Sequence, residues 1–114
     1  MTADFVNAVH RMQTSHHPDS PGKPGEQGIT AYYGPLTYGR VSFAVLADRQ
    51  YKSGPDGKVP PTTSGRADHV VDPKFDPKTA DVPGLELLGG PQTEFLRAWT
   101  KDWRGADMKA AASR

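Results

Sequence analysis

The sequence contains no cysteine among its 114 residues. That absence excludes disulfide bonds, zinc sites with thiolate ligands and thiol nucleophiles. No apolar stretch approaches the ~18 residues of a membrane-spanning helix, so we expect no membrane span. The first residues also lack the basic and apolar regions of a signal peptide, and the sequence does not indicate a compartment.

An excess of charge of either sign is also missing. The chain has 14 basic and 13 acidic residues, which gives a formal net charge of +1. The basic residues are scattered rather than gathered into runs. Because nucleic acids and anionic membranes attract strongly basic surfaces, this balance predicts no nucleic-acid partner.

Glycine and proline, in contrast, are abundant. The chain has 12 glycines and 11 prolines, hydrophobic residues make up 35%, and the mean hydropathy is -0.66. Such a composition predicts a modest core and much irregular structure. At this length the chain forms one domain at most.

Two segments have the apolar periodicity of amphipathic helices. The first is residues 3–14, whose stripe consists of Phe5, Val6, Val9 and Met12. The second is residues 91–104, whose stripe consists of Phe95, Leu96, Trp99 and Trp103. Pro91 suits a first helical turn, and Gly105 marks the end of the second helix. We expect each helix to bury its stripe against a partner surface.

Two further segments have the composition of β-strands, residues 29–33 and residues 36–47. The pair Gly34-Pro35 signals a turn between them. The second segment carries apolar or small side chains on both faces, which favours a strand covered on both sides over a half-exposed hairpin. Residues 107–112 are open to two interpretations, because alanine favours a helix while the position after Gly105 suits a strand.

Residues 54–84 contain six prolines and are expected to form a long loop. Residues 1–114 are thus expected to form a single α/β domain (α+β is possible). Its elements would be a few strands, two amphipathic helices and long loops rich in proline and glycine.

A polar cluster follows the strand expected at 36–47 and consists of Asp48, Arg49, Tyr51 and Lys52. Open α/β sheets present ligand-binding groups at the carboxyl ends of their strands. A guanidinium suits bidentate contacts with phosphate oxygens, so Arg49 is the leading candidate for substrate binding. The alternative is that Asp48 and Arg49 pair with neighbouring groups and hold the following loop.

Four residues are candidate metal ligands: His16, His17, Asp19 and His69. Zinc and iron sites need three or four ligands, usually oriented by further hydrogen bonds. Adjacent histidines in a proline-rich loop are more often solvated, and His10, beside the first helical stripe, is interpreted as a boundary residue. The sequence shows no complete catalytic set.

The order of these motifs resembles the PhoD-like metallophosphatases, the alkaline phosphatase D family. The resembling segments are Tyr32–Pro55, Gly65–His69, Leu87–Gly89, Gln92 and Phe95–Trp103. The likeness extends from about residue 5 to residue 109 and corresponds to a central segment of the family's domain.

The resemblance implies part of a four-layer α/β sandwich, in which two mixed sheets lie between helices around a dinuclear metal site. It implies an enzyme, often exported, that hydrolyses phosphate mono- or diesters with metal-activated water. The family's metal ligands and catalytic groups lie mainly in motifs like Trp-Asp-Asp-His and Gly-Asp-x-His, which this sequence lacks. Divalent ions are therefore expected in the intact enzyme and not in this chain alone.

By this interpretation the chain is a fragment or truncated homologue without catalytic residues, inactive alone, and the rest of the parent domain is missing. Arg49, Tyr51, Lys52 and Asp48 would line the side that faces the phosphate ester. A second hypothesis is a standalone binding module that uses residues 54–84 to hold a partner. A third is a remnant without function.

Overall fold

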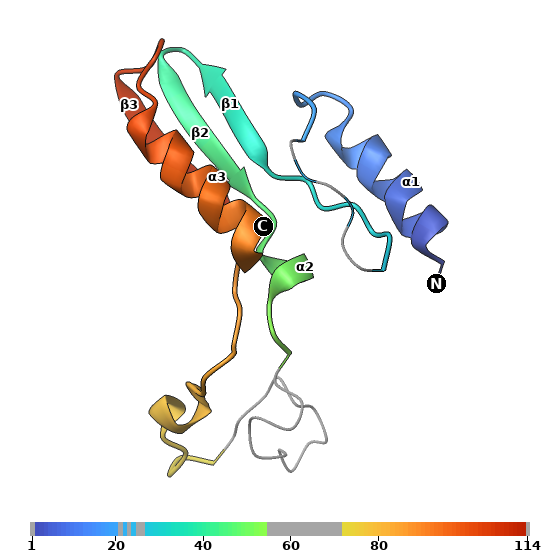
Figure 1. The fold of residues 1–114 in the computed structure, drawn as a ribbon, viewed down its shortest axis with the longest axis vertical. Helices are drawn as coiled ribbons and strands as arrows, with labels where there is room; N and C mark the ends of the chain where they lie inside the picture. Colours follow the sequence, from blue (N-terminus) through green and yellow to red (C-terminus); the bar gives the residue numbers. More distant parts are fainter. Residues whose placement is uncertain (1, 21, 23, 25–26, 55–71, 114) are drawn as a thin grey trace.

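The structure, a computed structural model, describes residues 2–20, 22, 24, 27–54 and 72–113. These residues form a mixed α/β arrangement of helices and one sheet (Figure 1). In chain order the elements are α1 (Ala3–Thr14), β1 (Gly34–Tyr38), β2 (Val41–Leu46), α2 (Asp48–Tyr51), the 3-10 helix η1 (Pro77–Ala80), α3 (Gly89–Lys101) and β3 (Met108–Ser113). Within this described part, every helix is too short or too polar to cross a bilayer.

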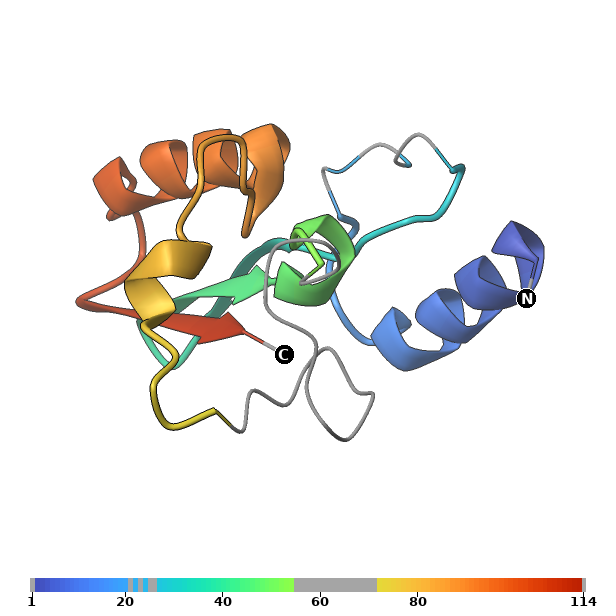
Figure 2. The same cartoon turned by 90° about the horizontal axis from the view of Figure 1, so that it is seen from below.

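The sheet has the order β1-β2-β3. β1 runs antiparallel to β2, and β3 runs parallel to it. Two parallel strands need a crossover, and α3 lies on that connection and packs along one face of the sheet (Figure 2). The sequence did not decide between helix and strand for residues 107–112. Most of these residues lie in β3, because the backbone of β2 pairs with them in register.

The prediction of strands over 29–33 and 36–47 is wrong in how it divides the chain. β1 begins at Gly34, where a turn was expected, and the predicted long strand is two strands joined at Gly39 and Arg40. These two residues have φ values of 56° and 64°. Positive φ at both central positions is what a two-residue type I′ hairpin requires.

Arg40 fastens this hairpin turn to the start of β3. Its Nε and one terminal nitrogen donate to the two carboxylate oxygens of Asp107, each at 2.5 Å. Its carbonyl oxygen accepts the Asp107 N–H at 2.8 Å. The side-chain hydrogen bonds from Arg40 lower the pKa of the Asp107 carboxyl.

We expect Asp107→Asn to remove part of the protein's sensitivity to acid. A carboxyl whose folded-state pKa is lowered contributes stability that is present above its unfolded value of about 4, and this stability is lost as the pH falls through the folded-state pKa. Thermal melts from about pH 6 to pH 2 should therefore show a shallower loss for Asp107→Asn than for the wild type. The exposed Asp81 supplies the control, Asp81→Asn. Equal slopes for Asp107→Asn and the wild type would contradict the expectation.

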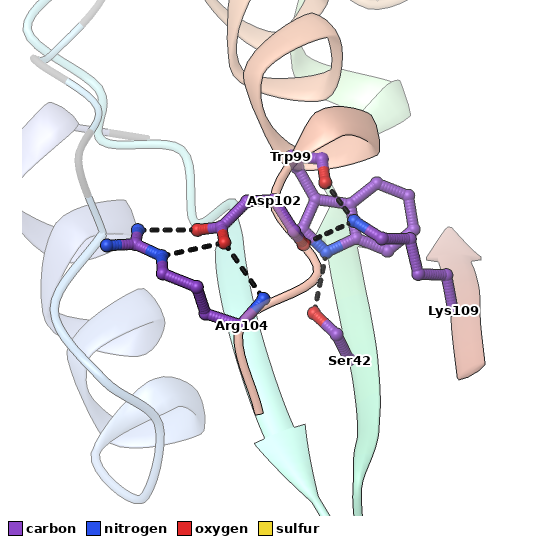
Figure 3. A network of polar contacts seen from close by, with 5 residues as sticks. All are labelled: Ser42, Trp99, Asp102, Arg104 and Lys109. Carbon is purple, nitrogen blue, oxygen red and sulfur yellow. Dashed lines mark hydrogen bonds and ion pairs between the residues drawn. The ribbon is translucent and has the colours of Figure 1, made fainter. Parts of the chain in front are cut away.

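One face of the sheet is covered by α3. Ser42, Ala44 and Leu46 of β2 point to this face and are buried. The indole N–H of Trp99 donates to the Ser42 hydroxyl at 2.9 Å, so α3 is held in place by a polar contact as well as by apolar packing (Figure 3). Phe95 packs against Tyr33, with ring centroids 5.7 Å apart.

α3 differs from the predicted helix at both ends. It begins at Gly89, two residues before Pro91, and it ends at Lys101 rather than near residue 104. The Asp102 carboxylate accepts the backbone N–H of Arg104 at 3.1 Å and pairs with its guanidinium. This local turn competes with helical hydrogen bonding and leaves Trp103 53% exposed, whereas Phe95, Leu96 and Trp99 of the same stripe are half-buried.

The end of α3 is capped by a cation from the neighbouring strand. The Lys109 ammonium donates to the carbonyl oxygens of Trp99 and Asp102 (Figure 3). It also lies over two indole rings, 4.5 Å from the Trp99 centroid and 4.8 Å from that of Trp103. A positive charge is favourable at a helix C-terminus, so Lys109 has a structural role.

The opposite face of the sheet is apolar, and the described residues leave it largely uncovered. Residues paired in register share a face, and the pairing places eight apolar side chains together. They are Leu36, Tyr38, Val41, Phe43, Val45, Met108, Ala110 and Ala112. Tyr38 is 80% and Met108 63% exposed. Within the described residues, β2 is therefore not covered on both sides as the sequence predicted.

Helix α1 has the predicted bounds but does not bury its stripe. None of its residues is buried, and Phe5 and Met12 are 57% and 79% exposed. The helix lies beside the sheet rather than over it (Figures 1 and 2). In the described part of the chain, α1 is joined to the rest by polar side chains, which are described below.

Candidate functional site at the carboxyl end of β2

The polar cluster predicted after the strand lies in helix α2, directly beyond the carboxyl end of β2. One buried residue, Ala47, separates the strand from this single helical turn. Since β2 and β3 are parallel, both end at the same edge of the sheet. The cluster therefore occupies the edge at which open α/β sheets place ligand-binding groups, as the sequence predicted.

Gln92 of α3 fixes the backbone at this edge. Its side chain is completely buried. Its Oε1 accepts the Ala47 N–H at 2.8 Å, and its Nε2 donates to the carbonyl oxygens of Ala47 at 2.9 Å and Leu88 at 2.8 Å. The amide thus pairs with Ala47 much as a neighbouring strand would, and it holds the residue that precedes Asp48.

Gly89, at the start of α3, supports α2 from the same side. Its φ is +72°, and a Cβ at this position would lie 2.8 Å from Cδ1 of Tyr51. Nearby, Ser53 and Glu86 exchange two hydrogen bonds, Ser53 N–H to the Glu86 carbonyl at 2.8 Å and Glu86 N–H to the Ser53 hydroxyl at 2.9 Å. The segments that follow α2 and precede α3 are therefore held together.

The four predicted substrate-side residues point in different directions. Arg49 is exposed and lines an open hollow of about 500 Å³, which we call the α1–α2 hollow; its lining residues are His10, Gln13, Ala47, Arg49 and Gln50. Tyr51 lines a separate hollow of about 760 Å³. Lys52 is exposed and lines neither. Of these four residues, only Arg49 lines the α1–α2 hollow.

Asp48, the first residue of α2, is half-buried. Its Oδ1 is buried and accepts no hydrogen bond from the described residues. The sequence-based alternative, in which Asp48 pairs with a neighbour, is therefore not seen for this oxygen. A buried acceptor left without a donor costs about 1 to 3 kcal/mol.

A chain of polar side chains joins α1 to α2 through residue 30. Asn7 Oδ1 accepts both the N–H and the hydroxyl of Thr30, at 2.8 Å and 3.0 Å. His10 Nδ1 lies 3.4 Å from the same hydroxyl, and His10 Nε2 lies 3.0 Å from Gln50 Nε2. The sequence prediction treated His10 as a boundary residue and missed this role, because its partners lie 20 and 40 residues away.

Three of the four candidate metal ligands lie in the described part of the chain, where they are not grouped as metal ligands. His16, His17 and Asp19 are exposed, and the His17 ring packs on Tyr32 with centroids 5.2 Å apart. Burial, and secondarily the charge of Asp19, raises the pKa of Tyr32. His69 lies outside the described residues. Within the described residues, no three His, Asp or Glu side chains gather as metal ligands.

The chain was also compared with known proteins. Comparison with family models, with curated proteins and with solved structures gave no match. The likeness to PhoD-like metallophosphatases therefore stands on the residues quoted for it, and the α1–α2 hollow carries the functional interpretation.

Proposed function

We propose that this chain is part of a PhoD-like metal-dependent phosphatase or phosphodiesterase, in which Arg49 binds the phosphate group. The observation that carries the proposal is the exposed Arg49 guanidinium in the α1–α2 hollow, at the carboxyl edge of the parallel β2–β3 pair. A guanidinium offers two parallel N–H donors to two phosphate oxygens. The Gln92 and Gly89 contacts give α2 the fixed position that such binding needs.

The sheet face that the described residues leave uncovered supports the view that further structure belongs to this domain. Phe43 and Val45 of β2 are only half-buried, and Leu36 on β1 is similar. Burial in a core is worth about 1.5 to 3 kcal/mol for each large apolar side chain, which favours covering this face. We assign the cover to the remainder of the parent domain, which would also supply the donor that Asp48 Oδ1 lacks.

The role proposed for this chain is phosphate binding and not activation of water. The divalent ions that such enzymes use have no ligand cluster among the described residues. We therefore expect the purified chain to hydrolyse neither a phosphate monoester nor a phosphate diester above the buffer rate when Zn²⁺, Mn²⁺ or Ca²⁺ is added. Metal-dependent turnover would overturn the assignment as a partial enzyme.

Anion binding tests the positive part of the proposal. We expect Arg49→Ala to weaken the binding of inorganic sulfate by about 10- to 100-fold, because a charge-assisted bidentate contact is worth about 1.5 to 3 kcal/mol. Amide chemical-shift titration by NMR measures the affinity. The matched control is Arg97→Ala, which removes an exposed arginine of α3 paired with Glu94. Equal losses in the two variants would show that sulfate responds only to net charge.

A further inference from the structure

The hydrogen bonds around His10 determine which of its nitrogens carries the proton. Gln50 Nε2 lies 3.2 Å from the Thr30 carbonyl oxygen and 3.0 Å from His10 Nε2. A carbonyl oxygen only accepts, so the Gln50 atom between these groups must be its donor nitrogen. His10 Nε2 must then be an acceptor without a proton, and the proton of the neutral ring lies on Nδ1.

The other end of the network agrees with this assignment. Asn7 Nδ2 donates to the Gly28 carbonyl at 2.8 Å, which leaves Asn7 Oδ1 as the acceptor of both Thr30 donors. The Thr30 hydroxyl hydrogen therefore points to Asn7, and its lone pairs face His10 Nδ1 at 3.4 Å. Every bond is consistent with a neutral His10 that donates from Nδ1 and accepts at Nε2.

We propose that His10 is a positioning residue for the α1–α2 hollow: as a neutral acceptor it holds Gln50, and through it α2 and Arg49, against α1. The inference deepens the proposed function and rests on it for the identity of the anion. His10 and Arg49 line the same hollow from two helices. No residue of α1 is fully buried, and these polar bonds attach the helix to residue 30 and to α2.

Protonation of His10 removes the acceptor. Both ring nitrogens then donate, and the Nε2–H opposes the donor nitrogen of Gln50. Turning the Gln50 amide does not restore the network, since its oxygen would then face the Thr30 carbonyl. Protonation therefore removes the hydrogen bond by which His10 holds Gln50, and with it this attachment of α2 to α1.

The charged and titratable groups around His10 lie on several elements. Arg49 of α2 shares the α1–α2 hollow with it. A neighbouring hollow on the His10 side of α1 is lined by Arg11, His17, Asp19 and Tyr32 among others. The charged side chain that shares the α1–α2 hollow with His10 and Gln50 is thus the Arg49 cation. The Asp19 carboxylate lines the neighbouring hollow.

A positioning role for His10 and direct contact between His10 and the anion predict opposite effects of pH on sulfate affinity. If a cationic His10 bound the anion itself, sulfate affinity would rise as the pH falls. Positioning through a neutral His10 predicts that affinity falls instead. Sulfate is the suitable probe because it keeps both charges at neutral and mildly acidic pH, whereas phosphate changes its own charge.

The experiment measures sulfate affinity by NMR at about pH 8 and pH 5.5 on the full chain. We expect the wild type to lose about fivefold in affinity at the lower pH, the magnitude of one lost hydrogen bond. His10→Gln, whose side-chain oxygen accepts at either pH, should change less than about twofold. His17→Gln is the matched control and should keep the wild-type dependence. Affinity that rises in acid, or an unchanged dependence in His10→Gln, would overturn the inference.

A second measurement on the wild type needs neither an anion nor a variant. Histidine ¹⁵N shifts at about pH 8 report the tautomer, and we expect His10 to carry its proton on Nδ1. Protonation should also lower the protection of the Gln50 side-chain amide hydrogens, measured relative to their intrinsic exchange rate at each pH. A proton on Nε2 would refute the positioning role. Absence of sulfate binding at every pH would refute phosphate binding by Arg49, while the tautomer and the amide exchange would still decide the role of His10.

Discussion

Replacing Gln92 with leucine is expected to destabilise the protein by about 3 to 5 kcal/mol, close to the whole stability of a small domain. The reason is that one side chain satisfies three backbone groups, the N–H and carbonyl of Ala47 and the carbonyl of Leu88. Leucine has similar size and no polar atom, so these groups lose their partners in a buried place. Urea unfolding followed by tryptophan fluorescence measures the loss.

Two variants separate hydrogen bonding from a general effect of substitution. Gln13→Leu makes the same change on the exposed side of α1 and should alter stability by less than about 0.5 kcal/mol. Gln92→Glu keeps the size and the acceptor for Ala47 but cannot donate to the two carbonyls while it is ionised. It should be strongly destabilising at neutral pH, and acid should partly restore it. Comparable stability of Gln92→Leu and the wild type would refute this account of α3 docking.

Gly89→Ala is the second large effect, and we expect it to cost about 2 to 4 kcal/mol. Two independent penalties add at this position. A left-handed φ of +72° costs a residue with a side chain about 1 kcal/mol or more, and the new Cβ would lie 2.8 Å from the Tyr51 ring. Tyr51 lies on α2 beside Arg49, so the same change should also weaken sulfate binding.

The neighbouring glycine is the control for this prediction. Gly90 has no atom within 4 Å of a Cβ placed on it and lies inside the same helix. Gly90→Ala should therefore be neutral or stabilising by up to about 1 kcal/mol. In the double variant Gly89→Ala with Tyr51→Ala, the steric penalty should disappear while the backbone penalty remains. A Gly89→Ala protein as stable as Gly90→Ala would show that α3 can begin without this backbone conformation.

Some features could be predicted from the sequence because their causes are local. The spacing of Phe5, Val6, Val9 and Met12 predicted α1 with its observed bounds. The position of Arg49 after a buried strand predicted its place at the sheet edge. Helical and strand patterns alternate along the sequence, which predicted the mixed α/β arrangement that is observed.

Other features depend on contacts between distant parts of the chain. The turn at Gly39 and Arg40 was missed because positive φ is uncommon for arginine, and this arginine is held by Asp107, 67 residues away. His10 was set aside because its own helix gives no sign of Gln50, its partner 40 residues on. The resemblance singled out Gln92, but its role became clear only through its bonds to Ala47.

The sequence by itself determined the helical stripe of α1, the β-rich segment and the charged group that follows it, because periodicity and composition act over a few residues. Only the tertiary structure decided that the segment is a hairpin, that β3 pairs with β2, and that His10 meets Gln50. Each of these depends on hydrogen bonds or ion pairs across tens of residues, and such partners are chosen by packing rather than by local preference.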